Sequence, residues 1–334
     1  NDAVRVKVFA TSAQQVRIVV KSDAGAVLFD EVRALSPEVI FDECIATSGA
    51  LFDTLSVRAN GLCWHAGRER DGEIPEPAKA APAPEDAATC EELYLIGLHL
   101  EQYRHATWSP VDYYEEALRR DPLDIRCNNA LGLWYIRKGR FEKAEPYLRT
   151  AVSVLTGRNP NPYDGEPVYN LALCLSWQGR YDEAYELFYK STWNAAWQDA
   201  GYFACAQISA RQGRWEDALD ELDHCLARNW HNHKARALKA AVLRHLGKAA
   251  EAEELICDSL KLDRFNYGCR FERILASGEG KDEFIALMRG ESHNYDELAL
   301  DYKAAGLCEE ADAVWTVARG EGALNPLSLY YWGK

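Results

Sequence analysis

The sequence RKGRFEKA, residues 137–144, decides the fold because closely similar segments recur three times downstream. The later copies are WQGRYDEA (177–184), RQGRWEDA (211–218) and HLGKAAEA (245–252). The glycines of the four copies lie 40, 34 and 34 residues apart, and the longer first interval contains the loop TGRNPNPYDGEP, residues 156–167. This spacing predicts that residues 125–266 are built from copies of one helical unit.

Small and bulky residues keep fixed distances from each glycine. A small residue precedes each glycine by seven positions, further small residues follow after five and twelve, and a bulky apolar residue follows after nine. The small residues are Gly132, Ala172, Ala206, Ala240, Ala144, Ala184, Ala218, Ala252, Ala151, Ser191, Cys225 and Ser259, and the bulky ones are Leu148, Phe188, Leu222 and Ile256. Small residues let two helices cross closely, and large ones fill the space toward the next unit.

This arrangement resembles the tetratricopeptide repeat (TPR), a helix–turn–helix unit of 34 residues. The resemblance implies a mainly α fold, a right-handed superhelix (α-solenoid) in which each unit buries its apolar face against its neighbours. We expect TPR-like helical repeats over residues 89–334, in about six to seven units. One unit, near 267–291, is degenerate in its spacing.

The first 70 residues follow a different pattern. Short segments rich in Val, Ile, Phe and Thr are separated by turn signals such as Asn60-Gly61. They predict a small antiparallel β-sandwich, immunoglobulin-like in outline, over residues 1–70. Residues 71–88 are rich in proline, alanine and glutamate, which predicts an extended linker between the two parts.

The composition of the chain argues against several classes of function. The formal net charge of −14 and the lack of a Lys/Arg run argue against binding to nucleic acid. No apolar stretch has the length of a membrane span, and no signal peptide is recognisable in this chain. None of the ten cysteines forms a Cys-x-x-Cys pair, and several, such as Cys205 and Cys225, stand at helix-packing positions. Reduced, buried cysteines behave in this way, so we expect a reducing, cytoplasmic compartment. No phosphate loop or dinucleotide fingerprint is present, so we expect no cofactor.

One stretch of the sequence combines residue types that bind metal ions. His224, Cys225, His231 and His233 lie close in sequence. Their spacing matches no zinc pattern, and Cys225 stands at a helix-packing position of the repeat. We therefore expect no metal site.

The first helix of each unit in a TPR array lines the concave face. On that face the register places polar, aromatic and cationic residues that are candidates for binding a partner: Asn129, Tyr169, Trp177, Phe203, Arg211 and His245. Such a mixture suits an extended peptide or a glycan, and the alternative is a solvated surface without a specific ligand. The carboxylate clamp of chaperone-binding TPR proteins needs Lys and Asn at set positions, of which only Lys234 fits, so the resemblance argues against that mode.

Three segments combine polar and aromatic residues that packing does not require: 101–110, 157–167 and 191–202. Loops on a rigid scaffold often carry function. Tyr163 is a further candidate for binding, and Asp164 and Glu166 are weak candidates for a catalytic carboxylate pair, the alternative being an ordered turn. Trp193 and Trp197, four residues apart, either stack against sugar rings or pack between repeats.

These segments, together with YYEEALRRDP (113–122) and NNALG (128–132), resemble the C-terminal part of large bacterial TPR proteins. In that group the N-terminal region is a mutarotase-like β-supersandwich, followed by a short β-domain and the repeats. The resemblance implies that the natural chain continues upstream and that the whole protein has a connection to carbohydrates.

The leading hypothesis is a binding and assembly module without catalysis of its own. Its partner is a protein or peptide, or an upstream domain of the same parent chain. The alternative is an accessory part of a carbohydrate-active, glycoside hydrolase-like enzyme that contributes substrate contacts to a glycan. A third hypothesis is homo-oligomerisation through the apolar C-terminal helix, which ends on Leu-Tyr-Tyr-Trp.

Overall fold

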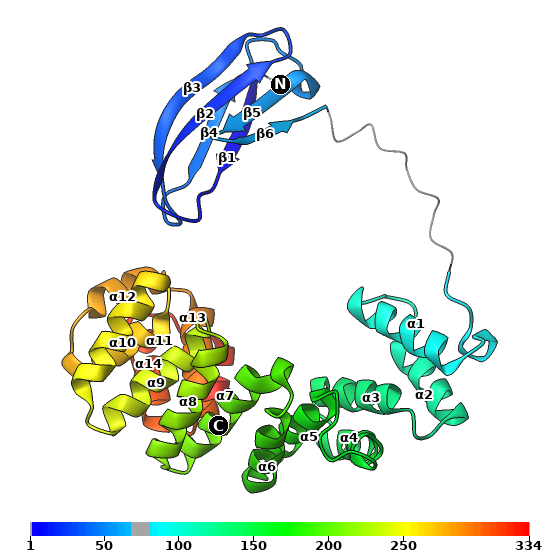
Figure 1. Cartoon of the computed structure of the whole chain (residues 1–334). Coiled ribbons are helices and arrows are strands. Elements are labelled where there is room, and N and C mark those ends of the chain that lie inside the picture. Colours follow the sequence, from blue (N-terminus) through cyan, green and yellow to red (C-terminus); the bar gives the residue numbers. More distant parts are fainter. Residues whose placement is uncertain (1, 68–79, 334) are drawn as a thin grey trace. The chain divides into compact units, whose positions relative to one another are not determined.

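The computed structural model describes residues 2–67 and 80–333, which form two compact units that divide between Ala80 and Ala81 (Figure 1). The first half of the predicted linker 71–88, residues 71–79, lies outside the described residues. Its last part contacts the helical unit, because Tyr113 Oη donates to Pro82 O at 2.8 Å and Arg120 Nη1 donates to Ala87 O at 2.7 Å. The exact limits of the predicted domains stay a prediction.

In residues 2–67 the N-terminal unit consists of β-strands and one 3-10 turn, η1 (Phe52–Thr54). Its strands are β1 (Ala3–Val8), β2 (Gln14–Ser22), β3 (Val27–Leu35), β4 (Phe41–Ala46), β5 (Leu55–Ala59) and β6 (Leu62–His65). β1 and β4 form one antiparallel sheet, and the other has the order β3-β2-β5-β6, also antiparallel. Val6 and Ile45 from the first sheet and Ile18 from the second share one buried core. The predicted antiparallel β fold is confirmed.

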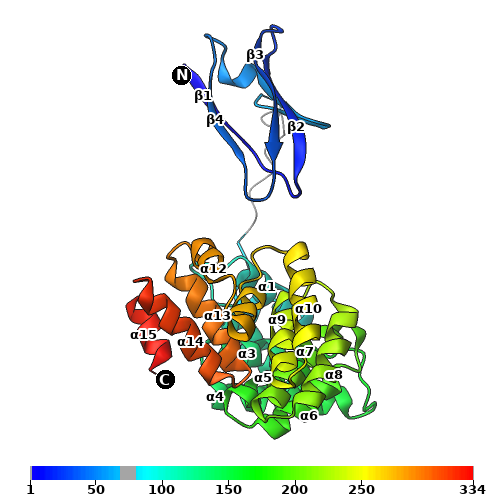
Figure 2. The same cartoon turned by 90° about the vertical axis from the view of Figure 1, so that its left-hand side faces the viewer.

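The second unit is a series of helices (Figure 2). They are α1 (Cys90–Gln102), α2 (Pro110–Arg120), α3 (Ile125–Arg137), α4 (Phe141–Thr156), α5 (Glu166–Trp177), α6 (Tyr181–Ser191), α7 (Gln198–Arg211), α8 (Trp215–Arg228), α9 (His233–His245), α10 (Ala249–Leu262), α11 (Tyr267–Ser277), α12 (Lys281–Met288), α13 (Ser292–Ala304), α14 (Cys308–Gly320) and α15 (Pro326–Trp332), with 3-10 turns η3 (Pro84–Asp86) and η4 (Ala195–Trp197). Consecutive helices pack in pairs from α1–α2 to α13–α14.

The repeated positions explain this pairing. The small residues at the fixed distances are buried, and so are the bulky ones such as Leu148 and Leu222, each 0% exposed. At Gly132 a Cβ atom would lie 2.4 Å from Leu148 Cγ, so the glycine is what lets α3 and α4 approach closely at this crossing. The predicted α-solenoid is confirmed.

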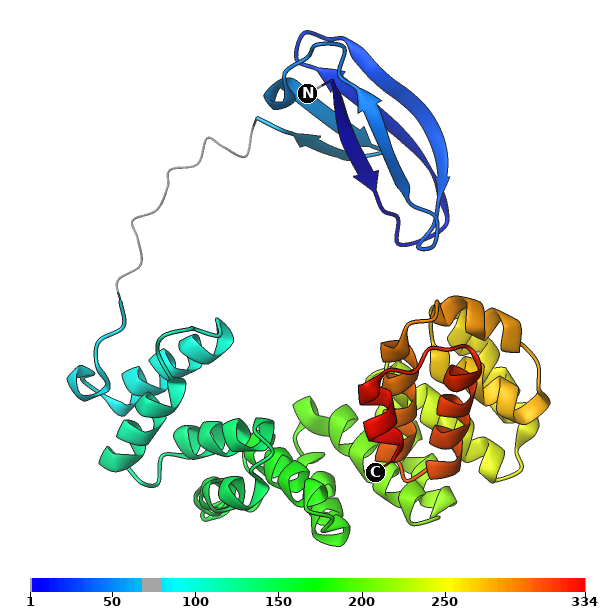
Figure 3. The same cartoon turned by 180° about the vertical axis from the view of Figure 1, so that it is seen from behind.

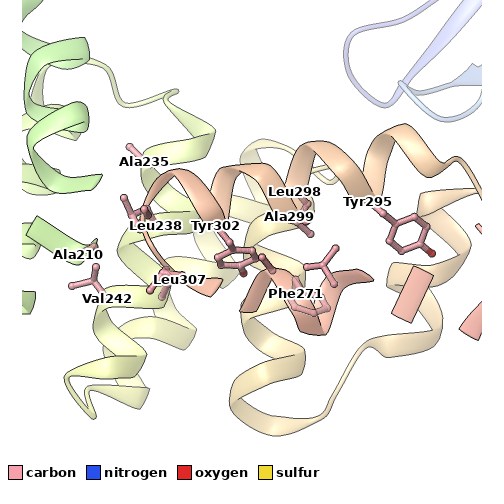
Figure 4. Packing of buried hydrophobic residues seen from close by; sticks show 14 of the residues in the cluster. Ala210, Ala235, Leu238, Val242, Phe271, Tyr295, Leu298, Ala299, Tyr302 and Leu307 are labelled. Atoms are coloured by element: carbon pink, nitrogen blue, oxygen red, sulfur yellow. The ribbon is translucent and has the colours of Figure 1, made fainter. Parts of the chain in front are cut away.

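The last pairs depart from a regular array. α12 has eight residues, whereas the second helices of the other pairs have 11 to 16. After this short helix, α13 contacts α7 and α9 across the concave face, the side lined by the first helices of the pairs (Figure 3). Leu238 and Val242 of α9 share a buried core with Tyr302 of α13 and with Leu307 (Figure 4). The chain therefore covers part of the concave face of its own C-terminal half.

Candidate functional site

The concave face of the N-terminal half remains open. A cavity of about 830 Å³ lies there between α1, α3 and the start of α5. Its apolar wall includes Tyr94, Leu98, Leu133 and Trp134. We call this cavity the α1/α3 groove. Its volume is in the range of sites that hold a peptide side-chain cluster or a small ligand.

The α1/α3 groove is positively charged, although the whole chain is acidic. Four cationic side chains line it, against the two carboxylates of Glu101 and Glu166. The cations are Arg104, Arg126, Arg137 and Lys138. With histidine neutral, the lining therefore has a formal charge of +2, whereas the chain carries −14. A local positive field of this kind attracts acidic ligands.

Two of these cations are paired and two are not. Arg126 Nη2 lies 2.6 Å from Glu91 and the guanidinium stacks over the Tyr94 ring at 4.7 Å, while Arg137 pairs with Glu101. The hydrogen bond from Arg126 lowers the pKa of Glu91 below its ordinary value. Within residues 2–67 and 80–333, Arg104 and Lys138 form no ion pair, and Lys138 Nζ lies 5.0 Å from the Trp134 ring. Both cations are therefore available to a ligand.

A network of amides and one carboxylate borders the groove at α5. Asn129 Nδ2 donates to Glu166 Oε1 at 3.0 Å, and Asn170 Nδ2 donates to Asn129 Oδ1 at 3.0 Å. Asp164 Oδ1 accepts from the backbone N–H of Glu166 at 2.9 Å, which fixes the turn into α5. In this arrangement Glu166 orients Asn129, and Asp164 holds the turn, so both carboxylates have structural partners.

The structure brings two of the polar, aromatic segments together. Asn194 Nδ2 donates to Tyr163 O at 2.7 Å, and a Cβ at Gly165 would lie 2.8 Å from Trp197 Cδ1. Trp197 also packs on Tyr169, with ring centroids 4.8 Å apart, and burial raises the pKa of that tyrosine. Trp197 thus takes the packing alternative, and the segments 157–167 and 191–202 support one another.

Three other candidate aromatic residues are exposed. Tyr163 is 84% exposed, Trp177 is 65% exposed and Trp193 is 55% exposed. Trp177 stacks on Phe141 with centroids 5.9 Å apart, and Lys190 Nζ lies 3.3 Å from the Trp193 ring centroid. Their outer faces are free for a partner, but none of them lines the α1/α3 groove.

The remaining candidates lie where α13 and α14 cover the concave face. Arg211 Nη2 donates to Lys303 O at 2.6 Å and to Ala304 O at 3.1 Å. His245 stacks on Trp215, centroids 4.2 Å apart. Its Nε2 lies 2.8 Å from Glu310 Oε1. Phe203 lines a smaller cavity of about 470 Å³ beside α13. Arg211 Nη2 and His245 Nε2 are thus engaged within the chain.

Sequence reasoning missed Tyr94 as a groove residue. The reason lies in the turn after α1, where Arg104 has φ +48° and takes the backbone conformation that Gly139 has after α3. Because a non-glycine residue stands at this turn, the glycine spacing gave no register for the first unit. Counting from the end of α1 instead would have placed Tyr94 on the concave face.

Comparisons with known proteins agree with the division of the chain into a β unit and a helical unit. The family described as YphG-like protein, second domain, matches residues 1–61, and the tetratricopeptide repeat family matches residues 125–154. A tetratricopeptide repeat protein from Parabacteroides merdae is 16% identical over 73% of this chain and 97% of its own, with a TM-score of 0.51. The helical unit has the fold of a TPR-like solenoid.

Two further solved structures have lower TM-scores against this chain. PilF from Pseudomonas aeruginosa is 17% identical over 67% of this chain and 96% of its own, with a TM-score of 0.49. YrrB, described as a TPR protein with an unusual peptide-binding site, is 14% identical over 55% of this chain and 92% of its own, with a TM-score of 0.46. At these identities the likeness of the TPR solenoid to them concerns the fold alone.

No group of three or more His, Cys, Asp or Glu side chains in residues 2–67 and 80–333 is arranged to hold a metal ion. In the predicted cluster, His224 stacks on Tyr202 with centroids 5.0 Å apart, and Cys225 is buried. No helix in the same part of the chain has the length and apolar character needed to cross a membrane.

Proposed function

We propose that this chain is a protein-interaction module that binds a segment of another protein in the α1/α3 groove. The observation that carries the proposal is the contrast between the two halves of the solenoid. In the C-terminal half, α13 and α14 cover part of the concave face and leave a cavity of about 470 Å³, whereas in the N-terminal half a cavity of about 830 Å³ on that face is lined by cations and aromatic rings. TPR solenoids present such surfaces to partners.

The chemistry of the groove favours a segment with acidic residues. Arg104 and Lys138 provide cations without an ion pair in the described ranges, and Trp134 and Leu133 provide an apolar surface. Exposed cations increase the rate of association with acidic partners, and apolar contacts supply most of the affinity.

Selection from a displayed peptide library tests the proposal. Peptides selected on the wild-type chain are expected to lose binding to Leu133→Asp, which places a charge in the groove. The matched control is Leu262→Asp on α10, where the side chain is exposed and outside the groove. If the selected peptides bind both variants as they bind the wild type, the groove is not the binding site.

A second candidate function is an accessory role in a carbohydrate-active parent protein. The exposed tryptophans Trp177 and Trp193 and the β unit support it. The match of residues 1–61 to the second domain of a YphG-like protein supports a parent protein with further domains. In such a protein the exposed rings would contact a glycan or a neighbouring domain. In the full-length parent, Trp193→Ala is expected to lower turnover of oligosaccharides without unfolding the chain, and unchanged turnover would exclude this role.

A further inference from the structure

The α1/α3 groove has an occupied counterpart within the same chain. α1 and α3 end at Gln102 and Arg137, and α7 and α9 end at Arg211 and His245. Tyr94 lies eight residues before the end of α1, as Phe203 lies eight before the end of α7. Arg126 lies eleven residues before the end of α3, as Lys234 lies eleven before the end of α9. The two grooves are therefore formed by equivalent positions of the repeat.

A helix of the chain itself, α13, lies in the second groove. Lys234 Nζ pairs with Asp301 Oδ1 of α13 at 2.6 Å, and Arg211 donates to the carbonyls of Lys303 and Ala304 at the end of that helix. Leu238 and Val242 of α9 belong to the same buried core as Leu298 and Tyr302 of α13. The occupant is thus an amphipathic helix that presents carboxylates to a cation and apolar residues to the floor of the groove.

The α1/α3 groove offers equivalent groups. Arg126 stands where Lys234 stands, and its side chain is 44% exposed. Gln102 stands where Arg211 stands and carries an amide that donates hydrogen bonds to helix carbonyls. Ala130 and Trp134 replace Leu238 and Val242, so the floor stays apolar with one smaller and one larger side chain.

From this correspondence we infer that the occupant of the α1/α3 groove is an acidic amphipathic helix of a partner protein, lying there as α13 lies against α7 and α9. A carboxylate of that helix pairs with Arg126, whose ion pairs with Glu91 and Asp124 within the described residues both involve Nη2. The carbonyls at its C-terminal end lie toward Gln102. The unpaired Arg104 and Lys138 at the same end of the groove favour the negative end of the helix dipole. This inference rests on the proposed function and adds the conformation and charge of the ligand.

A peptide with the sequence of α13, residues 292–304, bridged to hold it helical and labelled for fluorescence anisotropy, is the probe. Two matched peptides carry either amides in place of Asp296, Glu297 and Asp301, or proline in place of Ala299. Titrated with the complete chain, the acidic helix is expected to bind at least about tenfold more tightly than either matched peptide. The variant Arg126→Gln is expected to weaken it by about tenfold. Arg228→Gln, an exposed arginine on α8 outside the groove, is the matched control.

Each other result decides against the inference. Equal binding of the proline peptide overturns the helical ligand, and equal binding of the amide peptide overturns its acidic character. If weakening occurs with Lys234→Gln and not with Arg126→Gln, the peptide has displaced α13 and the assignment to the α1/α3 groove is wrong. A dimeric mass in light scattering that Arg126→Gln reduces to a monomer assigns the groove to a second copy of this chain.

Failure of the inference and failure of the proposed function have different signatures. If the acidic helix does not bind but peptides from the displayed library bind and are lost in Leu133→Asp, the ligand is an extended segment and the proposed function stands. If neither the helix nor any library peptide binds in the groove, the proposed function fails as well.

Discussion

Glu310 on α14 is a carboxylate that contacts two side chains of α9. Arg244 Nη2 donates to Glu310 Oε1 at 2.8 Å, and His245 Nε2 lies 2.8 Å from the same oxygen. Burial alone would raise the pKa of Glu310, but the hydrogen bonds from Arg244, the backbone and His245 outweigh it and lower that pKa below its ordinary value. A carboxylate whose pKa is lowered by folding stabilises the folded chain at pH values above the pKa of the same group in the unfolded chain. For glutamate that unfolded value is about 4.3. That stabilisation is lost as the pH falls through the folded value.

We predict that Glu310→Gln lowers the free energy of unfolding by about 2 kcal/mol at pH 7, because Arg244 and His245 lose their charged acceptor. Acidification from pH 7 to pH 3 should then destabilise the variant less than the wild type, since this group no longer takes up a proton. Urea denaturation followed by circular dichroism at several pH values measures both effects. Glu309→Gln, at the exposed neighbouring residue, serves as the control, and equal losses in the two variants would contradict the role of Glu310.

The cysteines give a second prediction at the scale of single residues. All ten thiols are free; Cys44, Cys63 and Cys308 are exposed, whereas five others are buried. Burial raises the pKa of Cys225 and of Cys269 to about 12, so at pH 8 their thiols are protonated as well as inaccessible. A short exposure of the native chain to a maleimide is expected to label the three exposed residues first. Mass spectrometry of peptides identifies the labelled positions, and rapid labelling of Cys225 would show that α8 opens readily.

At the scale of elements, substitutions at two glycines distinguish the cost of backbone strain from the cost of a steric clash. Gly213 and Gly306 both have positive φ, at 72° and 75°, and end α7 and α13. A Cβ at Gly213 would meet nothing within 4 Å, whereas one at Gly306 would lie 2.8 Å from Arg211 Cα. Gly213→Ala therefore costs about 1–2 kcal/mol for the left-handed backbone alone. Gly306→Ala is expected to cost about 1–3 kcal/mol more, because α13 must move away from α7.

Thermal or urea unfolding of the two glycine variants measures this difference. Proteolysis of the Gly306→Ala chain should begin between α12 and α14, since that substitution loosens the contact with α7. Identical stabilities of the two variants would mean that α13 is not held against α7 in solution.

The C-terminal helix α15 closes the apolar end of the solenoid. Trp332 stacks on Trp315, centroids 6.3 Å apart, and Trp315 is 0% exposed. Asp296 accepts hydrogen bonds from Trp315 Nε1 at 3.0 Å and from Ser328 Oγ at 2.8 Å. Removal of residues 325–334 is expected to destabilise α13 and α14 by at least about 2 kcal/mol, since it exposes Trp315 and takes one partner from a buried carboxylate.

Hydrogen exchange of α13 and α14 in the truncated chain measures that loss. Leu329→Asp, at a side chain that is 57% exposed, should leave exchange unchanged and is the better test of the proposed oligomer. A lower mass in light scattering for Leu329→Asp would support an interface at α15. Unchanged exchange in the truncated chain would contradict its capping role.

Across the whole molecule, sequence reasoning was accurate where neighbouring units determine the structure. Positions such as Ala144 and Leu148 are buried because each helix pair packs on the next pair. Since every pair makes the same contacts, the residues that pack recur at a fixed spacing in the sequence. The contact of α13 with α7 joins residues 92 positions apart in Arg211 and Lys303, and the repeat spacing carries no information on such distances. The short α12 was visible only as a break in the pattern. For this reason the concave face was predicted as one surface, although its C-terminal half is covered.

The division of the chain gives the last prediction. The β unit and the helical unit have separate cores, and within the described residues no core cluster combines residues of both. A β unit of this size buries only about 60% of the surface that its unfolded chain exposes, so it should be the less stable part. In scanning calorimetry, the full chain is expected to show a small early transition and a broad later one. The fragment 81–334 should keep the later transition at an unchanged midpoint, because its core is complete without residues 1–80. A midpoint several degrees lower in the fragment would show that the two units stabilise each other and fold as one.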